Sequence, residues 1–225
     1  MKADIKLMAS AGIKLLMGLV LVGLLIFLPA GTIRFFNGWL FVAVLFVPML
    51  IAGVVMALRS PELLKKRLNA KEKENEQKSV VAMSGIMFIA AFVVAGLNYR
   101  YSWIVMPSWV VWGAVALFLL SYLMYAEVLR ENAYLSRCIE VQQGQKVIDT
   151  GLYGIVRHPM YSATVLMFLA MPLVLGSLPS FVIMLMYIPL IVKRIRNEEK
   201  VLLDGLDGYE EYCRKVKYRV MPFVW

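Results

Sequence analysis

Four long apolar runs are the feature that most limits how this chain can fold. They cover residues 15–28, 38–58, 80–97 and 109–129, and Glu127 is the one charged residue within them. About 20 helical residues cross the roughly 30 Å hydrocarbon layer of a bilayer, so these runs predict membrane-spanning helices. No small-residue cleavage pattern follows the first run, which we therefore interpret as a membrane helix and not as a signal peptide.

A further apolar block, residues 160–192, is too long for a single crossing. Residues 176–180 read Gly-Ser-Leu-Pro-Ser and divide the block into two arms of about 12–16 residues. Pro172 and Pro189 are expected to kink these arms. The block therefore predicts a helical hairpin that passes through, or nearly through, the bilayer.

The predicted fold class is all-α, a polytopic integral membrane helical bundle of five to six segments in one domain, residues 1–225. Residues 1–129 would form four transmembrane helices. Residues 130–225 would form a cofactor-binding region with the hairpin and a C-terminal helix. A content of 61% hydrophobic and 17% charged residues is typical of membrane proteins. Between the second and third runs, Ser60-Pro61-Glu62 predicts the start of a short basic surface helix over residues 63–70.

The basic residues alternate from one connection to the next. Most Lys and Arg residues fall in segments 1–10, 59–79, 130–159 and 193–225. The connections between these segments hold only Arg34 and Arg100. Because basic loops stay on the cytoplasmic side, we expect both termini and the active site there. The formal charge of +9 then follows from this bias and from attraction to lipid headgroups, without a nucleic-acid partner.

Metal and disulfide chemistry are not expected. His158 is the only histidine, and no Cys/His cluster has the spacing of metal ligands. Cys138 and Cys213 would both lie on the cytoplasmic side and stay reduced. Glu127 is interpreted as a border residue that reaches water, although an inward-facing acid would be a functional candidate.

A polar strap, residues 151–158, leads directly into the hairpin. It ends in Arg157 and His158 and is followed by Pro159, which disfavours helical geometry at the residue before it and suits the first turn of a helix. We therefore expect an extended segment at the mouth of a membrane helix. The free N–H groups and positive dipole end of that helix favour an anionic group.

A second polar cluster, Arg194 with Glu198 and Glu199, follows the hairpin. Together with the Gly-x-Tyr-x-x-x-Arg-His-Pro-x-Tyr pattern of residues 151–161, it resembles the isoprenylcysteine carboxyl methyltransferase (ICMT) family, which is similar to the phospholipid N-methyltransferases. The resemblance covers about the last 90 residues. It implies S-adenosyl-L-methionine as cofactor and a lipid-like acceptor that enters from the bilayer, above all an isoprenylcysteine carboxylate.

The resemblance also assigns cofactor contacts to particular positions. These are Gln145, Lys146, Val147, Ile148, Tyr153, His158, Pro159, Met160, Tyr161, Glu198 and Glu199. Gln145 stands where the family has a histidine. Arg194 matches the arginine that meets the acceptor carboxylate and is the predicted catalytic residue.

The residue types suit this chemistry. S-Adenosylmethionine carries an ammonium and a carboxylate, which require an acid and cationic or N–H donors. Adjacent residues on a helix point about 100° apart, so one of Glu198 and Glu199 can face the cofactor while the other faces a basic neighbour. A carboxylate acceptor is already ionised near neutral pH, so methyl transfer would need alignment and exclusion of water and no general base.

Three alternatives stay open on the sequence. An amine or phospholipid acceptor would have to be neutral, which a poorly hydrated site favours. The C-terminal region of NADPH-dependent sterol-type reductases looks similar and also carries Arg-His-Pro and tyrosines. A phosphate-bearing dinucleotide, however, requires more cationic contacts than a site that contains the two acids Glu198 and Glu199 suggests. A transporter is the least favoured, because the intramembrane stretches hold almost no ionisable residues.

Overall fold

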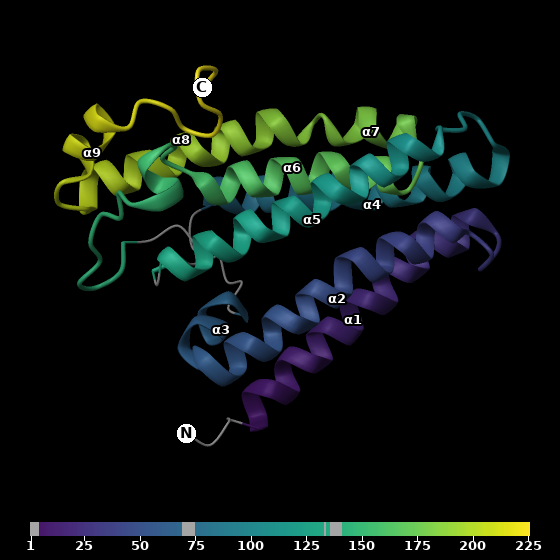
Figure 1. Cartoon of the computed structure of the whole chain (residues 1–225), viewed down its shortest axis with the longest axis horizontal. Helices are drawn as coiled ribbons and strands as arrows, with labels where there is room; N and C mark the ends of the chain where they lie inside the picture. Colours follow the sequence, from purple (N-terminus) through teal and green to yellow (C-terminus); the bar gives the residue numbers. More distant parts are fainter. Residues whose placement is uncertain (1–4, 69–74, 133, 136–140) are drawn as a thin grey trace.

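The structure, a computed structural model, describes residues 5–68, 75–132, 134–135 and 141–225. All regular elements of this described part are helical, and they lie side by side as a bundle (Figure 1). The prediction of an all-α membrane bundle is therefore confirmed. The expectation for Cys138 and part of the charged run after the surface helix lie outside the described residues, whereas Cys213 is a free thiol.

The first two helices form an antiparallel pair. They are α1 (Ile5–Ala30) and α2 (Phe36–Arg59), and Gly31 begins the turn between them with a φ of 69°. Few residues other than glycine adopt this left-handed conformation. The short helix α3 (Pro61–Leu68) starts at Pro61, as the sequence predicts.

The next two helices flank the hairpin on either side. They are α4 (Asn75–Tyr101) and α5 (Ser108–Glu131). Near the end of α5, Glu127 forms an exposed ion pair with Arg130, whose Nη2 lies 2.6 Å from the carboxylate oxygen Oε1. This geometry supports the interpretation of Glu127 as a border residue.

The apolar block of residues 160–192 folds as a helical hairpin with a broken second arm. Its helices are α6 (Pro159–Val174), α7 (Leu178–Met184) and α8 (Tyr187–Gly205), and the short helix α9 (Tyr209–Lys215) follows. The Ser177 side chain caps α7 by accepting a hydrogen bond from the backbone N–H of Ser180. The break between α7 and α8 lies just before Pro189, whose missing N–H and ring disfavour a continuous helix.

Five stretches of the described residues are long and apolar enough to span a membrane. They are 6–30, 36–59, 79–101, 108–131 and 178–205, the last combining α7 and α8. The remaining apolar helix, α6, has only 16 residues. The chain is therefore an integral, multi-pass membrane protein, in line with the prediction of five to six segments.

Small residues allow close packing between α4 and its neighbours. Ala91 and Ala95 of α4 are completely buried, and Gly96 lies against the backbone of α1. A Cβ atom on Gly96 would lie 2.5 Å from the carbonyl oxygen of Ile26. Along the other side of the bundle, α5 packs against α6, so the hairpin is held in the interior by α4 and α5.

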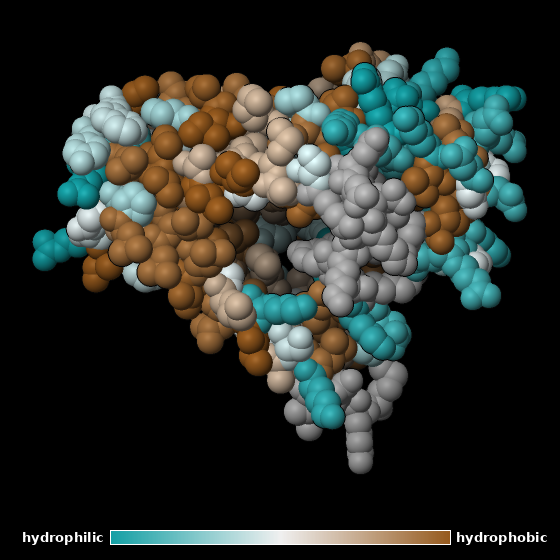
Figure 2. Space-filling model, turned by 180° about the vertical axis from the view of Figure 1, so that it is seen from behind, coloured by the Kyte–Doolittle hydropathy of each residue, from teal (hydrophilic) through white to brown (hydrophobic). Residues whose placement is uncertain are grey.

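The surface is apolar over most of its area, as expected for a lipid-facing protein. Figure 2 shows this apolar surface, with hydrophilic side chains gathered mainly at one end. The same end carries α9 and the C-terminal part of α8 (Figure 1). The bundle therefore has one strongly polar end, and the candidate site lies there.

Replacement of Gly96 by alanine should test the packing of α1 on α4. We expect Gly96→Ala to lower the free energy of unfolding in detergent by about 1–3 kcal/mol, because an overpacked contact must shift the backbone. Gly113→Ala, on α5, is the matched control, since a Cβ at Gly113 meets no atom within 4 Å. The control should be neutral or slightly stabilising. Equal melting temperatures for the two variants would contradict the close α1–α4 contact.

Candidate functional site

The polar strap begins with a glycine that no other residue can replace without strain. Gly151 has a φ of 51°, and a Cβ on it would overlap the carboxylate of Glu131. A single 3₁₀ turn, η1 (Gly151–Gly154), follows. The strap is thus anchored against the end of α5, which directs the rest of it across the polar end of the bundle.

The strap ends where α6 begins. His158 has the non-helical angles φ −127° and ψ 62°, and Pro159 is the first residue of α6. The backbone N–H groups of Arg157 and His158 donate hydrogen bonds to the carbonyl oxygens of Tyr218 (2.9 Å) and Arg219 (2.8 Å). The strap is therefore non-helical at the mouth of α6, although His158 is not fully extended, and it pairs with the C-terminal segment, residues 216–225.

The carboxylate of Glu199 joins these segments to α8. The Nε atom of Arg219 donates to Glu199 Oε2 at 2.7 Å, and His158 Nε2 lies 3.3 Å from Oε1. Arg157 Nε lies 3.0 Å from Oε1 as an ion pair whose N–H is not aligned for a hydrogen bond. Both Glu199 and Arg157 are buried. Glu199 is thus surrounded by basic groups, and its negative charge is compensated within the protein.

Glu198 points in a different direction and belongs to a separate hydrogen-bonded chain. The hydroxyl of Tyr161 donates to Glu198 Oε2, and the Nε atom of Arg194 donates to the same hydroxyl oxygen at 3.0 Å. His158 Nδ1 lies 4.0 Å from Glu198 Oε1. The different directions of the two adjacent glutamates agree with their expected separation on the helix.

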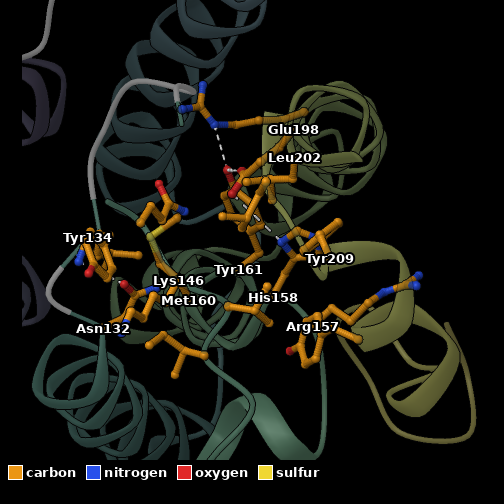
Figure 3. A pocket seen from close by; sticks show the side chains of 17 residues that line it. Asn132, Tyr134, Lys146, Arg157, His158, Met160, Tyr161, Glu198, Leu202 and Tyr209 are labelled. Atoms are coloured by element: carbon orange, nitrogen blue, oxygen red, sulfur yellow. Dashed lines mark hydrogen bonds and ion pairs between the residues drawn. The ribbon is translucent and has the colours of Figure 1, made fainter. Parts of the chain in front are cut away.

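A pocket of about 100 Å³ lies between the strap, α8, α9 and the segment that precedes the strap. In Figure 3, Tyr134 and Lys146 lie on one side of it, and His158, Tyr161 and Tyr209 lie on the other. The full set of lining residues is Asn132, Tyr134, Leu135, Gln145, Lys146, Val147, Ile148, Arg157, His158, Met160, Tyr161, Arg194, Glu198, Leu202, Leu206, Tyr209 and Tyr212. Segments more than 70 residues apart in the sequence thus form one site.

The structure brings most of the predicted site residues into this pocket. Those that line it are Gln145, Lys146, Val147, Ile148, His158, Met160, Tyr161, Arg194 and Glu198. Tyr153, Pro159 and Glu199 do not line it. Tyr153 is buried, and its hydroxyl accepts a hydrogen bond from Asn132 Nδ2 at 2.9 Å. Pro159 starts α6 and Glu199 supports the strap, so the geometry gives these three residues supporting positions.

Sequence reasoning gave no role to the aromatic residues of α9 or to Arg219. Tyr209 and Tyr212 lie one helical turn apart in α9. Gly208 precedes this helix, and its φ of 81° allows the sharp turn from α8 into α9. That Gly-Tyr-x-x-Tyr spacing was the available signal. Within the described residues the Tyr209 hydroxyl is buried without a hydrogen-bond partner. The Tyr212 hydroxyl donates to the carbonyl oxygen of Tyr153 at 2.7 Å.

Burial disfavours ionisation of these tyrosines, which are protonated at neutral pH even at their ordinary pKa. It raises the pKa of Tyr209 and of Tyr212 well above the ordinary value, and it raises the pKa of Tyr153 to about 12. The ionised phenolate is disfavoured because a poorly hydrated environment does not stabilise its charge. The unpartnered Tyr209 hydroxyl is therefore a hydrogen-bond donor available to a ligand in the pocket.

Comparison with known proteins places the polar end of this chain near one class of membrane enzyme. Residues 127–225 match the model of the family described as "Ergosterol biosynthesis ERG4/ERG24 family". The chain is 32% identical over 90 residues to the Delta(14)-sterol reductase TM7SF2 of Mus musculus, a match that covers 39% of this chain and 22% of the relative. It is 30% identical over 90 residues to the Delta(14)-sterol reductase erg24 of Schizosaccharomyces pombe, covering 39% of this chain and 21% of the relative.

These matches are local. The chain spans about a fifth of the length of the curated relatives that it matches. The matched segment nevertheless contains all 17 residues that line the pocket, from Asn132 to Tyr212. The similarity therefore concerns the candidate site and the hairpin, while the N-terminal helices lie outside it.

The comparisons correct the functional interpretation of the sequence. The predicted membership of the ICMT family is wrong, and so are the methyltransferase activity and the use of S-adenosylmethionine, because the matching proteins are sterol reductases. The Arg-His-Pro strap and the tyrosines define a polar pocket at a membrane border, and such a pocket can serve more than one cofactor. The sequence argument also counted Glu199 against a dinucleotide, although its charge is compensated by Arg157 and Arg219.

Removal of the Glu199 charge should destabilise the site. We expect Glu199→Gln to lower the free energy of unfolding by about 3 kcal/mol, because it leaves the buried Arg157 without its counter-ion. Glu210→Gln is the matched control, since Glu210 forms an exposed pair with Arg214 in α9, and such pairs contribute little. Thermal unfolding in one detergent would compare the variants. If both melt like the wild type, the Glu199 cluster does not hold the strap.

Proposed function

We propose that this chain is a membrane reductase that uses a nicotinamide dinucleotide, in the first instance NADPH, to saturate a carbon–carbon double bond of a sterol-like lipid. The observation that carries the proposal is the position of the pocket, which lies entirely within residues 127–225, the segment that matches the ergosterol biosynthesis ERG4/ERG24 family model. Because the matches are local, we infer only the class of the substrate, a sterol-like lipid that reaches the site from the bilayer.

The charges that line the pocket suit a phosphate-bearing dinucleotide. Arg157 lines the pocket but is paired with Glu199, so the cationic residues of the described lining outside that cluster are Lys146 and Arg194, and Glu198 is the acidic one. Arginine and lysine are the usual partners of phosphate groups. The pocket of about 100 Å³ is smaller than the roughly 300–1,000 Å³ of typical ligand sites, so it would hold one end of such a molecule.

Saturation of a double bond requires a hydride at one carbon and a proton at the other. A bound reduced nicotinamide supplies the hydride, and the protein must supply the proton. Tyr161 is the candidate donor because its hydroxyl lines the pocket and lies between Arg194 and Glu198. The N–H of Arg194 would stabilise the phenolate that is left when the proton leaves.

Arg194 and Glu198 thus have different roles in this reaction from those that the sequence predicted. Arg194 would stabilise charge on the Tyr161 oxygen and would not bind an acceptor carboxylate. Glu198 would hold the phenol in position and return a proton to it after each turnover. Tyr209, the buried donor of α9, would hydrogen-bond to the cofactor or to a polar group of the lipid.

We propose that the site faces the cytoplasm. The basic connections, which include the strap and the residues after α8, lie at the polar end of the bundle, and such connections usually stay cytoplasmic. A water-soluble dinucleotide would then reach the pocket from the cytosol, while the lipid would reach it from the membrane. Both termini would lie on the same side.

Binding experiments with purified protein test the proposal directly. Calorimetric titration should give saturable binding of NADPH and no binding of S-adenosylhomocysteine. Incubation with NADPH and a Delta(14)-unsaturated sterol should oxidise one NADPH for each sterol reduced. Binding of S-adenosylhomocysteine alone would overturn the proposal. Binding of NADPH without reduction of any lipid in a total extract would remove the assigned reaction.

Loss of the Tyr161 hydroxyl should separate chemistry from binding. We expect Tyr161→Phe to lower kcat by about 10²–10⁴-fold, the usual contribution of a positioned acid, while the Kd for NADPH stays unchanged. Tyr101→Phe is the control, because Tyr101 is exposed at the other end of α4. An unaffected kcat in Tyr161→Phe would exclude this residue as the proton donor.

Removal of one pocket cation should weaken dinucleotide binding. We expect Lys146→Gln to raise the Kd for NADPH about tenfold, since a charge-assisted hydrogen bond to phosphate contributes about 1.5 kcal/mol. Lys200→Gln, on an exposed position of α8 outside the pocket, is the control. The effect should shrink as the salt concentration rises. Equal Kd values for the two variants would place the phosphates away from Lys146.

A further inference from the structure

Among the described residues, the end of the bundle opposite the candidate site carries exposed arginines and no acidic side chain. It is made by the turns that join α1 to α2, α4 to α5 and α6 to α7 (Figure 1). Arg34 and Arg100 lie at these turns and are exposed. No Asp or Glu occurs in residues 5–61, 79–126 or 150–197, which hold all of these turns and the parts of the helices next to them. The two arginines are therefore open to pairing with an anionic group from outside this part of the chain.

An apolar groove opens between α1 and α2 at the same end. Its volume is about 580 Å³, and its lining is almost entirely hydrophobic. Gly23 deepens it, because a Cβ at this position would meet no atom within 4 Å. The indole N–H of Trp39 donates to the carbonyl oxygen of Ile33 at 2.8 Å, so the polar atom of this lining residue already has a partner. The groove thus offers a ligand apolar surface along its length.

A guanidinium group lies at the end of this groove. Gly31 lines the groove, and a Cβ on it would lie 3.5 Å from Cζ of Arg100. Arg34 belongs to the same turn as Gly31. Trp103, in the adjacent connection, and Trp109, at the start of α5, are exposed. Exposed tryptophans of this kind mark the depth of the lipid headgroups, so the cationic end of the groove lies where phosphates are found.

We propose that the groove binds one acyl chain of a glycerophospholipid, with the phosphate of that lipid held by Arg100 and Arg34. The apolar groove fits a hydrocarbon chain, and the unneutralised arginines fit the anionic group to which such a chain is joined. A second copy of this chain would present the same two arginines and no acid from this end. The charges therefore favour a lipid over a self-interface. This site is separate from the reductase pocket and from its substrate.

Native mass spectrometry of delipidated protein in detergent tests the site. Titration with dioleoyl phosphatidylglycerol should give one tightly bound molecule, and dioleoylglycerol, which has the same chains without the phosphate, should bind about tenfold more weakly. Arg100→Gln should reduce the preference for the phospholipid, and Gly23→Phe should fill the groove and abolish binding of both lipids. Lys200→Gln and Gly53→Phe are the matched controls, because Gly53 of α2 also has open space around it.

The possible results separate the alternatives. Melting temperatures of all variants measured without lipid show which of them are folded, and Arg100→Gln keeps the test valid if Gly23→Phe does not fold. Equal affinity of the wild type for the two lipids, or an Arg100→Gln variant that keeps the full preference, would overturn the proposal. A wild-type dimer that persists in excess phospholipid and is lost in Gly23→Phe would assign the groove to a second copy instead.

Discussion

The interactions of one buried carboxylate hold the candidate site together. Glu199 accepts from Arg219 of the C-terminal segment and lies against Arg157 and His158 of the strap, so three segments meet at a single side chain of α8. Burial of these charges costs free energy that only their mutual pairing offsets. The arrangement fixes where the strap ends, and therefore where Tyr161, the third residue of α6, faces the pocket.

Compensation of Glu199 also bears on the cofactor proposed for the pocket. If Glu198 and Glu199 were both unpaired acids, as the sequence alone suggests, they would favour a ligand with an ammonium group. With Glu199 paired to Arg157 and Arg219, the other charged residues of the lining are the cations Lys146 and Arg194 and the acid Glu198, a balance that favours phosphate groups. The choice between a methyl donor and a hydride donor thus turns on how Glu199 is paired with arginines about 20 and 40 residues away in the sequence. The residue types in the motifs do not reveal this pairing.

Much of the fold could be predicted because a bilayer imposes simple rules. Apolar runs of sufficient length gave the spans, and Pro159, Pro61 and the break before Leu178 gave helix boundaries, since each depends on local chemistry. Sequence reasoning also brought the two polar clusters to one end. The contributions of Arg219 and Tyr209 could not be predicted in this way, because the C-terminal segment and α9 acquire their positions only through contacts with the strap. The lining roles of the predicted residues stay predictions until a ligand is observed.

The short length of α6 sets the depth of the reaction centre. Its 16 residues rise about 24 Å, which is about 6 Å less than the hydrocarbon layer. With the turn after α6 at the opposite surface, the strap and His158 would lie beneath the headgroups at the polar end of the bundle. In the reaction proposed above, a sterol-like lipid could then meet a water-soluble dinucleotide without leaving the membrane. The free energy that it would cost to transfer the lipid from the membrane into water would therefore not be needed.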